Sequence, residues 1–199
     1  KTITIFKNIK ETNTPFHKDV LFILDRIKSG KNKELIKKIR KTTEKNQRNE
    51  LKKNLPAICF SGKFSKRNSD SIIEHSGLLC LDFDGYKKNK EMLQDKERFC
   101  KDSYVYSCFV SPSGNGLKVI IKVPADIDSH ENYFKALEMH FDSPHFDKSC
   151  KDISRVCYES YDPLIYVNQN SNTWDIFADI EYKEVSKFDE IEPTIPITD

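Results

Sequence analysis

The sequence Leu78-Leu79-Cys80-Leu81-Asp82-Phe83-Asp84-Gly85 gives the clearest indication of architecture in the chain. An apolar run that ends in two aspartates and a glycine is typical of a buried strand that carries carboxylates at its end. Because side chains alternate between the faces of a strand, we expect Asp82 and Asp84 to point to one side and Phe83 to the other. Two neighbouring carboxylates are costly to bury unless a cation lies between them, and Mg²⁺ or Mn²⁺ is the natural partner. The alternative is an ordinary polar turn formed by Asp84 and Gly85.

A hairpin is expected further along the chain. Residues 104–110 and 117–123 have strand-like patterns, and they are connected by Ser111-Pro112-Ser113-Gly114-Asn115-Gly116. A hairpin needs only a short turn, so this longer connection has spare backbone N–H groups that could bind an anion, and Lys118 would add a positive charge. A simple turn rich in Gly and Asn is the alternative. The spacing does not match a P-loop, and a strand follows where a P-loop has a helix.

The remaining segments alternate between helical and strand-like patterns, which predicts an α+β fold. Apolar residues at helical spacing predict helices over residues 17–28, 33–43, 69–75, 87–100 and 129–141. Shorter apolar and β-branched runs predict strands over residues 2–6, 55–62, 155–158, 164–167 and 173–177. A basic loop is expected over residues 63–68.

The composition is typical of a water-soluble globular protein. Of the 199 residues, 37% are hydrophobic and 32% are charged, and this length suits one sizeable domain or two small ones that share a sheet. No apolar run approaches membrane-spanning length and no signal peptide opens the chain, so we expect a cytoplasmic protein without a membrane partner. The six cysteines form no C-x-x-C pair, which favours reduced thiols over a disulfide framework.

Charge is distributed unevenly along the chain. Residues 1–68 contain 19 Lys or Arg against 6 Asp or Glu, whereas residues 69–199 contain 14 against 25. A basic first part suggests a polyanion partner, although solvated helix faces would give the same composition. No aromatic residue is interleaved between residues 31 and 55, so a base-stacking platform is not expected there. The candidates for contact with a nucleic-acid backbone are Lys37, Lys38, Arg40, Lys41, Lys63, Lys66 and Arg67.

A zinc site is suggested by four residues that lie close in the sequence, His140, His145, Cys150 and Cys157. Their spacing matches no common zinc motif, and Cys157 falls within an expected strand. We therefore do not expect zinc at these residues.

Three short motifs resemble, in the same order, those of the archaeo-eukaryotic primase superfamily of primase-polymerases. They are Asp82-Phe83-Asp84 on a strand, Ser113-Gly114-Asn115-Gly116-Leu117-Lys118 at a hairpin, and Phe146-Asp147. The superfamily has a D-x-D motif, an S-G-x-G-x-H-like element and an Asp after a hydrophobic residue in these places. The resemblance covers nearly the whole chain, to about residue 178.

The wider sequence context is similar to the branch of that superfamily called the VirE amino-terminal domain. In that branch the domain typically precedes a helicase-like segment in replication proteins of phages or mobile elements. The similarity is carried by Leu55-Pro56-Ala57, Phe60-Ser61-Gly62, His75-Ser76-Gly77-Leu78-Leu79, Asp152-Ile153-Ser154-Arg155 and Ser160-Tyr161-Asp162-Pro163.

The resemblance implies a two-metal nucleotidyltransferase site. Asp82, Asp84 and Asp147 would be catalytic and would hold two Mg²⁺ or Mn²⁺ ions, with Asp152 as the other candidate for the third ligand. Nucleoside triphosphates would be the substrates, and their phosphates would be bound by Ser113, Gly114, Asn115, Gly116, Lys118 and Arg155. A single-stranded nucleic acid would be the template, and a helicase-like domain or protein would be the partner.

The resemblance also implies the fold and the division of the chain. The expected fold is a primase-polymerase core, in which helices flank a mixed or antiparallel sheet of the RNA-recognition type, plus an N-terminal α/β subdomain. Residues 1–68 would be the basic N-terminal α/β part of the same domain, residues 69–178 the catalytic core, and residues 179–199 an acidic linker toward a helicase-like domain. The implied function is template-directed synthesis or extension of primers in DNA replication.

Two other functions fit part of the sequence. The superfamily usually has His where this chain has Lys118, so a catalytically weakened nucleic-acid or nucleotide-binding module attached to a helicase is the second candidate. Asp82-Phe83-Asp84-Gly85 also fits the opening motif of haloacid-dehalogenase-like phosphatases, in which the first Asp is a nucleophile. Tyr86 stands where Thr is usual in that motif, and no later G-D-x-x-x-D pair occurs, which argues against a phosphatase.

Overall fold

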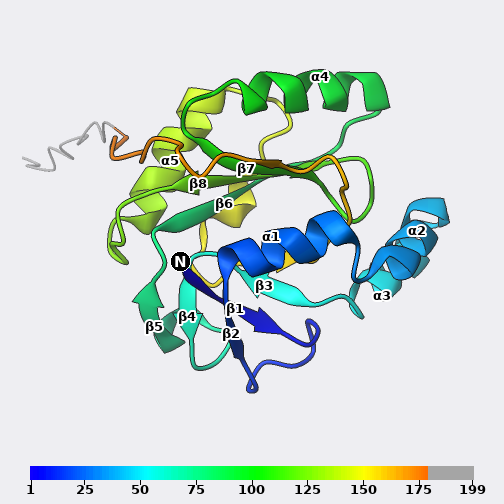
Figure 1. The fold of residues 1–199 in the computed structure, drawn as a ribbon, viewed down its shortest axis with the longest axis horizontal. Coiled ribbons are helices and arrows are strands. Elements are labelled where there is room, and N and C mark those ends of the chain that lie inside the picture. The colour runs from blue at the N-terminus through cyan, green and yellow to red at the C-terminus, as the bar shows by residue number, and fades with distance from the viewer. Residues whose placement is uncertain (179–199) are drawn as a thin grey trace, which may run out of the picture.

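Residues 1–178, the part of the chain that the computed structural model describes, form a mixed α+β fold (Figure 1). Within this range there are five α-helices, two four-stranded sheets and one two-stranded sheet, and every strand pairing is antiparallel. The four-stranded sheets have the orders β2-β1-β3-β9 and β10-β7-β8-β6, while β4 pairs with β5. The predicted α+β class is therefore confirmed.

The elements have the following bounds. The helices are α1 (Val20–Ser29), α2 (Lys33–Lys41), α3 (Lys45–Lys52), α4 (Asn89–Cys100) and α5 (His130–Phe141), with short 3₁₀ turns η1 (Ser69–Ser71) and η2 (Lys148–Lys151). The strands are β1 (Thr2–Phe6), β2 (Phe16–Asp19), β3 (Ala57–Cys59), β4 (Gly62–Phe64), β5 (Ile72–His75), β6 (Leu78–Phe83), β7 (Val105–Val110), β8 (Leu117–Lys122), β9 (Cys157–Tyr158) and β10 (Tyr166–Val167).

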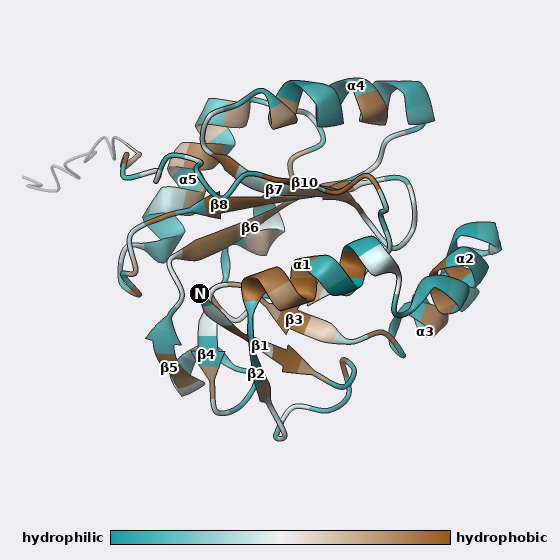
Figure 2. Cartoon of the chain, in the orientation of Figure 1, coloured by the Kyte–Doolittle hydropathy of each residue, from teal (hydrophilic) through white to brown (hydrophobic). Residues whose placement is uncertain are grey.

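Helix α1 lies between the two four-stranded sheets (Figure 1). Its buried residues Ile23 and Ile27 pack in one apolar cluster with Ile58 of β3 and Ile120 of β8. Figure 2 shows that the strands of both sheets are mostly hydrophobic, whereas α2 and α3 are largely hydrophilic. Because removal of apolar surface from water is the main driving force of folding, this shared cluster holds the two sheets together through α1.

Helices α4 and α5 cover the other face of the β6-β7-β8 sheet (Figure 1). Phe83, at the end of β6, has its ring centroid 4.5 Å from that of Phe99 in α4 and 5.4 Å from that of Phe141 in α5. Phe83 is fully buried, while its neighbour Asp82 faces the opposite side of the sheet. The alternation predicted for this strand is thus present, with Phe83 in the core and Asp82 directed away from it.

Several predicted elements agree with the structure to within two residues at each end. These are the strands over residues 2–6, 104–110 and 117–123 and the helices over residues 33–43, 87–100 and 129–141. All six cysteines are free of disulfide bonds, as their spacing predicts. In the described range, no helix combines the length and the apolar character needed to cross a membrane.

Two predicted helices differ from the structure because long-range strand pairing overrides the local pattern. The helix over 17–28 begins only at Val20, since residues 16–19 pair with β1 and Asp19 caps α1 by accepting a hydrogen bond from the Leu21 N–H. The helix over 69–75 is wrong: only η1 is helical, and β5 pairs with β4, which includes part of the loop predicted over 63–68.

Smaller corrections concern three further segments. The strand predicted over 55–62 corresponds to β3 and to Gly62, the first residue of β4. The strand predicted over 173–177 is reduced to a single bridge between Thr173 and Lys122. In α4, Leu93 is 47% exposed, although the neighbouring Met92 is buried. Helix α3 was not predicted, since it buries no residue and therefore shows no apolar stripe.

Strand pairings cross the predicted boundary between residues 68 and 69. Strand β9 pairs with β3 in the N-terminal sheet, and β4 and β5 lie on either side of the boundary. The two predicted parts are therefore joined by main-chain hydrogen bonds in addition to the cluster around α1. The acidic linker predicted over 179–199 lies outside the described residues.

Candidate metal and phosphate site

Asp82 lies at the end of β6, directly opposite Lys118 on the neighbouring strand β8. The Lys118 ammonium forms an ion pair with Oδ2 of Asp82, and the side chains are only 12% and 13% exposed, respectively. The other carboxylate oxygen, Oδ1, is buried and accepts no hydrogen bond from any residue between 1 and 178. A buried carboxylate oxygen without a donor is costly, so this atom is suited to a ligand.

Asp147 is brought to Asp82 by a short strand-like contact. Phe146 forms an antiparallel bridge with Phe83, and the Asp147 N–H donates to the Asp82 carbonyl oxygen at 2.8 Å. On the other side of the bridge, the Asp84 N–H donates to the His145 carbonyl oxygen at 2.8 Å. The ring of Phe146 packs against Phe83 in the core, so the aspartate that follows it faces the opposite side, beside Asp82.

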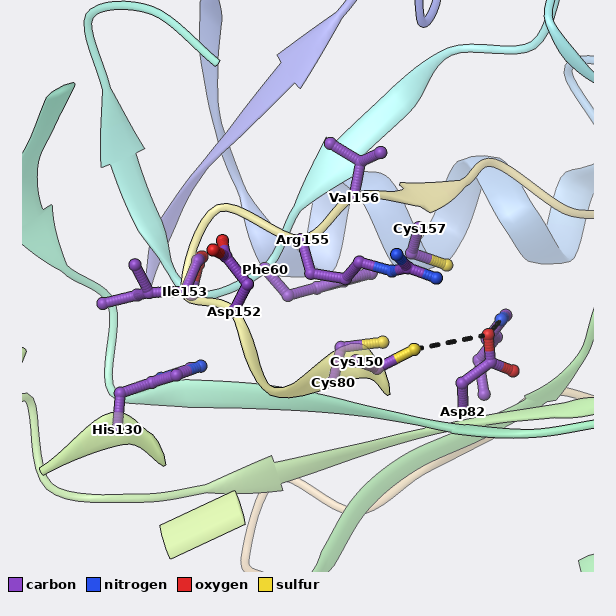
Figure 3. Close-up of a pocket in the computed structure, with 12 residues that line it drawn as sticks. Phe60, Cys80, Asp82, His130, Cys150, Asp152, Ile153, Arg155, Val156 and Cys157 are labelled. Atoms are coloured by element: carbon purple, nitrogen blue, oxygen red, sulfur yellow. Dashed lines mark hydrogen bonds and ion pairs between the residues drawn. The ribbon is translucent and has the colours of Figure 1, made fainter. Parts of the chain in front are cut away.

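Cys150 adds a thiol to these two carboxylates. Its Sγ donates to Oδ2 of Asp147 at 3.2 Å and lies 4.0 Å from Oδ2 of Asp82 (Figure 3). One donor atom from each of Asp82, Asp147 and Cys150 lies within 4.8 Å of the others. Among residues 1–178, these three form the one group of at least three possible metal-ligating side chains that lie so close together.

Asp84 shares with Asp82 the wall of a cavity of about 180 Å³, to which Asp147 and Cys150 do not contribute. Asp82, Asp84, Ser113, Lys118 and Arg155 all contribute to the cavity wall, together with Lys52, Ser111, Pro112, Val156 and Tyr158. Asp84 is exposed and approaches Gly116 so closely that a Cβ atom there would overlap its Oδ1 and would lie 2.8 Å from the Phe83 carbonyl oxygen. A glycine at this position is therefore needed for Asp84 to reach the cavity.

The turn between β7 and β8 contributes only part of the predicted phosphate-binding surface. Ser113 lines the cavity, whereas Asn115 is exposed and does not. The Gly114 N–H donates to the Ser111 carbonyl oxygen at 3.0 Å, which closes the turn. The side chain of Arg40 lies against Gly114, so the turn is also covered from α2.

The pKa values in this group reflect burial and three neighbouring carboxylates. Burial raises the pKa of Asp82, and the charges of Asp84 and Asp147 raise it further, while Lys118 acts in the opposite direction. Burial would raise the pKa of Asp147 as well, but hydrogen bonds from Ser149 and Cys150 bring it below its ordinary value. For Lys118, burial would lower the pKa, but Asp82 and Asp84 raise it well above the ordinary value, so the ammonium stays charged.

Asp152 does not join the metal-ligating group. Its carboxylate accepts two 2.6 Å hydrogen bonds from the backbone N–H and hydroxyl of Ser154, which hold the local turn. Arg155 instead approaches Asp147, with Nη2 at 3.9 Å from Oδ2. Of the two candidates for a third acid, the structure thus places Asp147, and not Asp152, beside Asp82.

Lys52 lines the same cavity, although it was not among the predicted phosphate-binding residues. It lies at the end of α3, and burial lowers its pKa while the nearby Asp84 carboxylate acts in the opposite direction. Its ammonium has no ion-pair partner in the described part of the chain, in contrast to that of Lys118. The sequence shows Lys52 only as one of many lysines in a basic run, so its position could not be recognised without the fold.

The seven predicted nucleic-acid-binding residues lie in two separate places. Helix α2 carries the first group, Lys37, Lys38, Arg40 and Lys41. Strand β4 and the loop after it carry the second group, Lys63, Lys66 and Arg67. Figure 1 shows α2 and β4 at opposite ends of the molecule. Several are engaged within the protein: Arg40 donates to the carbonyl oxygens of Ser111 and Tyr161, and Lys63 pairs with Glu74. The α2 group is the one near the cavity, since Arg40 reaches the turn that contains Ser113.

The four residues considered for zinc have other contacts. His140 bonds to Asp102 at 2.7 Å, and His145 stacks on Tyr86 with ring centroids 3.8 Å apart. Cys157 packs in the cluster around α1. Only Cys150 belongs to the metal-ligating group described above.

Comparison with protein-family models identifies one match, to the BT4734-like, N-terminal domain, over residues 50–166. This range includes the aspartates, Lys52, Lys118 and Cys150 of the site. No curated protein and no solved structure gives a significant match. Because the match covers more than half of the chain, the chain belongs to the BT4734-like N-terminal domain family.

Proposed function

For this member of the BT4734-like N-terminal domain family, we propose a nucleotidyltransferase of the primase-polymerase type. It synthesises or extends primers on a single-stranded template during replication of a phage or mobile element, in association with a helicase-like domain or protein. The observation that carries the proposal is the bridge between Phe83 and Phe146, which brings Asp147 beside Asp82. Asp82 in turn lines a cavity together with Asp84 and three basic side chains. Carboxylates and cations in one cavity are what phosphoryl-transfer chemistry requires.

The order of elements around the site supports a primase-polymerase core with a sheet of the RNA-recognition type. The chain runs β6-α4-β7-β8-α5 and then returns to β6 through Phe146, and β8 lies between β6 and β7. This is the β-α-β-β-α-β arrangement of ferredoxin-like folds. In such a sheet the first strand and the returning segment are neighbours, which explains how two distant acidic motifs come together.

The donor set at the site fits divalent metal ions. Asp82 offers a buried Oδ1 that has no hydrogen-bond donor among the described residues, and Asp147 and Asp84 add further carboxylates. We propose that these three residues hold two divalent ions, of which Mg²⁺ and Mn²⁺ suit oxygen ligands. Ions bound there would lower the pKa of an attacking 3′-hydroxyl and neutralise charge on the triphosphate.

The basic side chains have different tasks in this proposal. Lys52 has an unpaired ammonium at the cavity and binds the phosphates of the incoming nucleotide, with the Ser113 hydroxyl and Arg155 as further donors. Lys118 is already paired with Asp82, so it orients that carboxylate and keeps it ionised. The exposed lysines of α2 contact the template backbone, where their contribution depends on salt concentration.

One observation favours a second candidate, a binding module without catalytic activity. Lys118 occupies an oxygen of Asp82 that a metal ion would otherwise use, so the site is partly neutralised by the protein itself. Such a module would bind nucleotide or nucleic acid for an attached helicase. The phosphatase has less support, because the carboxylate of Asp82 is buried and paired, whereas a nucleophile must be open to the phosphorus atom.

The test is a primer-synthesis assay on single-stranded DNA with Mg²⁺ or Mn²⁺, in which ribonucleotides and deoxynucleotides are compared. We expect incorporation by the wild-type chain, and its loss in the double variant Asp82→Asn, Asp84→Asn. The matched control is Asp70→Asn, an exposed acid in η1 away from the cavity. Undiminished incorporation by the double variant would exclude the proposed site. A metal-dependent melting shift with nucleotide, without incorporation on any template, would favour the binding module.

A further inference from the structure

Another cavity, of about 320 Å³, opens between α1 and the strands β1 and β2, and it shares no residue with the cavity that contains Asp82 and Asp84. We call it the edge groove, and its wall includes Ile5, Phe16, Lys18, Phe22, Ile23 and Arg26. Strand β2 is an edge strand of its sheet, so no further strand covers this border of the fold within residues 1–178.

Two phenylalanine rings of the edge groove are half exposed to solvent. Phe16 of β2 is 52% exposed, and Phe22 of α1 is 51% exposed. Helix α1 packs on the sheets through its other face, which carries the buried Ile23 and Ile27, so Phe22 is not needed to hold the helix. Aromatic surface that folding leaves in water at a cavity is available to stack on a planar ligand.

Basic side chains surround these rings, and no acidic side chain contributes to the wall of the groove. The Nζ atom of Lys18 lies 5.8 Å from the centroid of the Phe22 ring. The guanidinium of Arg26 is balanced by the carboxylate of Glu159. Lys7 and Lys18, in contrast, have no ion-pair partner in the described part of the chain. Two uncompensated ammonium groups beside exposed aromatic rings favour a ligand that is both planar and negatively charged.

Single-stranded nucleic acid has both properties. Its unpaired bases stack on aromatic side chains, and its phosphates pair with lysines. An acidic peptide would be attracted by the same charges and could pair with the free edge of β2. However, β2 has only four residues and carries Lys18, and a short edge strand with a lysine resists pairing with another chain. The chemistry of the groove therefore favours nucleic acid over peptide.

We propose that the edge groove binds single-stranded nucleic acid. The rings of Phe16 and Phe22 stack on its bases. The ammonium groups of Lys7 and Lys18 pair with its phosphates. The inference rests on the proposed function, which requires a single-stranded template, and it gives that strand a binding place outside the catalytic cavity.

The groove is tied to the catalytic cavity through adjacent residues. Arg26 of the groove is held by Glu159, and the preceding residue, Tyr158, lines the cavity together with Asp82. The pairing of β9 with β3 fixes the same segment. A strand held in the groove is therefore bound at a constant distance from the catalytic cavity.

The test measures the binding of fluorescein-labelled oligothymidine to the full chain by fluorescence anisotropy, in EDTA and without nucleotide, so that catalysis plays no part. We expect the double variant Phe16→Leu, Phe22→Leu to bind at least about tenfold more weakly than the wild type, as for one lost base stack. Leucine keeps the apolar surface and removes only the stacking. The matched control is Phe177→Leu, whose ring is also 52% exposed but stacks on Tyr133 of α5, and it should bind as the wild type does. Duplex DNA, whose bases are already stacked, should bind equally to the wild type and the double variant.

The lysines are tested through the salt dependence of the same binding. We expect Lys7→Gln, Lys18→Gln to reduce the slope of log affinity against log salt concentration by about 1.4, or about 0.7 for each lost phosphate contact. The control pair Lys88→Gln, Lys90→Gln, at the exposed start of α4, should leave the slope unchanged. Equal slopes for the two pairs would exclude the lysines of the groove from phosphate contact.

A further variant keeps the inference testable if the leucine substitutions disturb folding. Phe22→Trp retains an aromatic ring, and we expect oligothymidine to quench the fluorescence of the new indole. Trp174 is only 4% exposed, so the fluorescence of the wild type should not respond.

The inference would be overturned by equal affinity of the wild type and the double leucine variant for oligothymidine, or by the absence of quenching in Phe22→Trp. Quenching by an acidic, tyrosine-containing peptide but not by oligothymidine would assign the groove to a protein partner and would also overturn it. Primer synthesis with binding that does not depend on the two rings would contradict this inference alone. Binding that depends on the rings, without primer synthesis by the wild type, would contradict only the proposed function.

Discussion

Lys118 determines the charge state of the site more than any other single residue. Its ammonium is charged and paired with Asp82, in a position where both side chains are nearly removed from water. Removal of one partner leaves the other charge buried without compensation. The free-energy cost of that charge is usually larger than the net stabilisation that the intact pair provides. This lysine thus allows Asp82 to be ionised without a metal ion.

We predict that Lys118→Met destabilises the metal-free protein by about 3 kcal/mol, because it leaves the Asp82 carboxylate buried without a counter-ion. The loss should be smaller at low pH, since the raised pKa of Asp82 lets this carboxyl take up a proton there. Added Mn²⁺ should restore part of the stability. Chemical unfolding with and without Mn²⁺ measures both effects.

The matched control for this substitution is Lys122→Met in the same strand, whose ammonium, within residues 1–178, donates to the Gln169 carbonyl oxygen. It should change the free energy of unfolding by less than about 1 kcal/mol. Equal stabilities of Lys118→Met and the wild type in the absence of metal would contradict the importance of the buried pair.

Lys52 is expected to act on nucleotide binding. We predict that Lys52→Ala raises the KM for the nucleoside triphosphate roughly tenfold or more, the equivalent of one lost charge-assisted hydrogen bond of about 1.5–3 kcal/mol. The melting temperature should change little, because the side chain is only partly buried and has no ion-pair partner among the described residues. Lys90→Ala, at the exposed start of α4, serves as the control, and equal KM values for the two variants would remove Lys52 from the site.

At the level of elements, β5 and α5 are joined by two buried histidines. His75 Nε2 lies 3.0 Å from His130 Nδ1, and His75 Nδ1 accepts a hydrogen bond from the Gly77 N–H. His75 must therefore carry its proton on Nε2 and donate it to His130, which carries its own proton on Nε2. Neither ring can take up a second proton without losing one of these hydrogen bonds.

We predict that stability falls as the pH is lowered through the range of this pair. Burial lowers the pKa of both histidines from 6.5 to about 4. At His75, the charge of Lys1 also lowers the pKa, whereas that of Asp126 raises it. At His130, the charges of Asp152 and Glu131 act against the effect of burial. Both are neutral in the folded state, so their contribution is complete above pH 6.5 and is lost between pH 6.5 and about 4. The loss should be on the order of 3 kcal/mol for each histidine, from a shift of this size.

Urea unfolding at a series of pH values measures this effect. The variant His75→Gln, His130→Gln should show a flatter dependence between pH 6.5 and 4 than the wild type. The exposed His17→Gln should leave the dependence unchanged. If the double variant shows the same pH dependence of the free energy of unfolding as the wild type, other groups are responsible for it.

For the whole molecule, the parts predicted as residues 1–68 and 69–178 behave as one unit in the structure. Glu159 is fully buried and accepts hydrogen bonds from Arg26 Nε at 2.6 Å and Nη2 at 3.0 Å, which ties α1 to the segment after β9. The pairing of β3 with β9 and the apolar cluster around α1 connect the same parts. The cavity also needs both, since Lys52 comes from the first part and the aspartates from the second.

We predict that Arg26→Ala lowers the free energy of unfolding by about 3 kcal/mol, because Glu159 then remains buried without its cation. Unfolding should stay a single transition, with far-ultraviolet circular dichroism and the fluorescence of Trp174, the one tryptophan of the chain, changing together. Arg98→Ala, which breaks an exposed pair with Asp95, is the control and should cost less than about 1 kcal/mol. Two separate transitions in the wild type would show that the parts fold independently.

Local pattern was sufficient where the chain itself specifies the structure. The apolar run before Asp82 predicted β6, the strand patterns on either side of residues 111–116 predicted the β7–β8 hairpin, and the amphipathic spacing of 129–141 predicted α5. In these segments the periodicity of burial equals the periodicity of the element. The pattern failed at β5 and at the start of α1, where pairing with a distant strand outweighs local helix signals.

The sequence by itself determined that two aspartates stand at the end of a buried strand, because alternation along a strand is a local property. Only the tertiary structure decided what surrounds Asp82. The register of β6 with β8 places Lys118 beside it. The bridge between Phe83 and Phe146 brings Cys150, 68 positions away in the sequence, close to it. Such contacts depend on which backbone groups pair across the fold, and a one-residue change in register would turn each side chain to the opposite face. The nature of the site therefore follows from strand pairing, which no local pattern encodes.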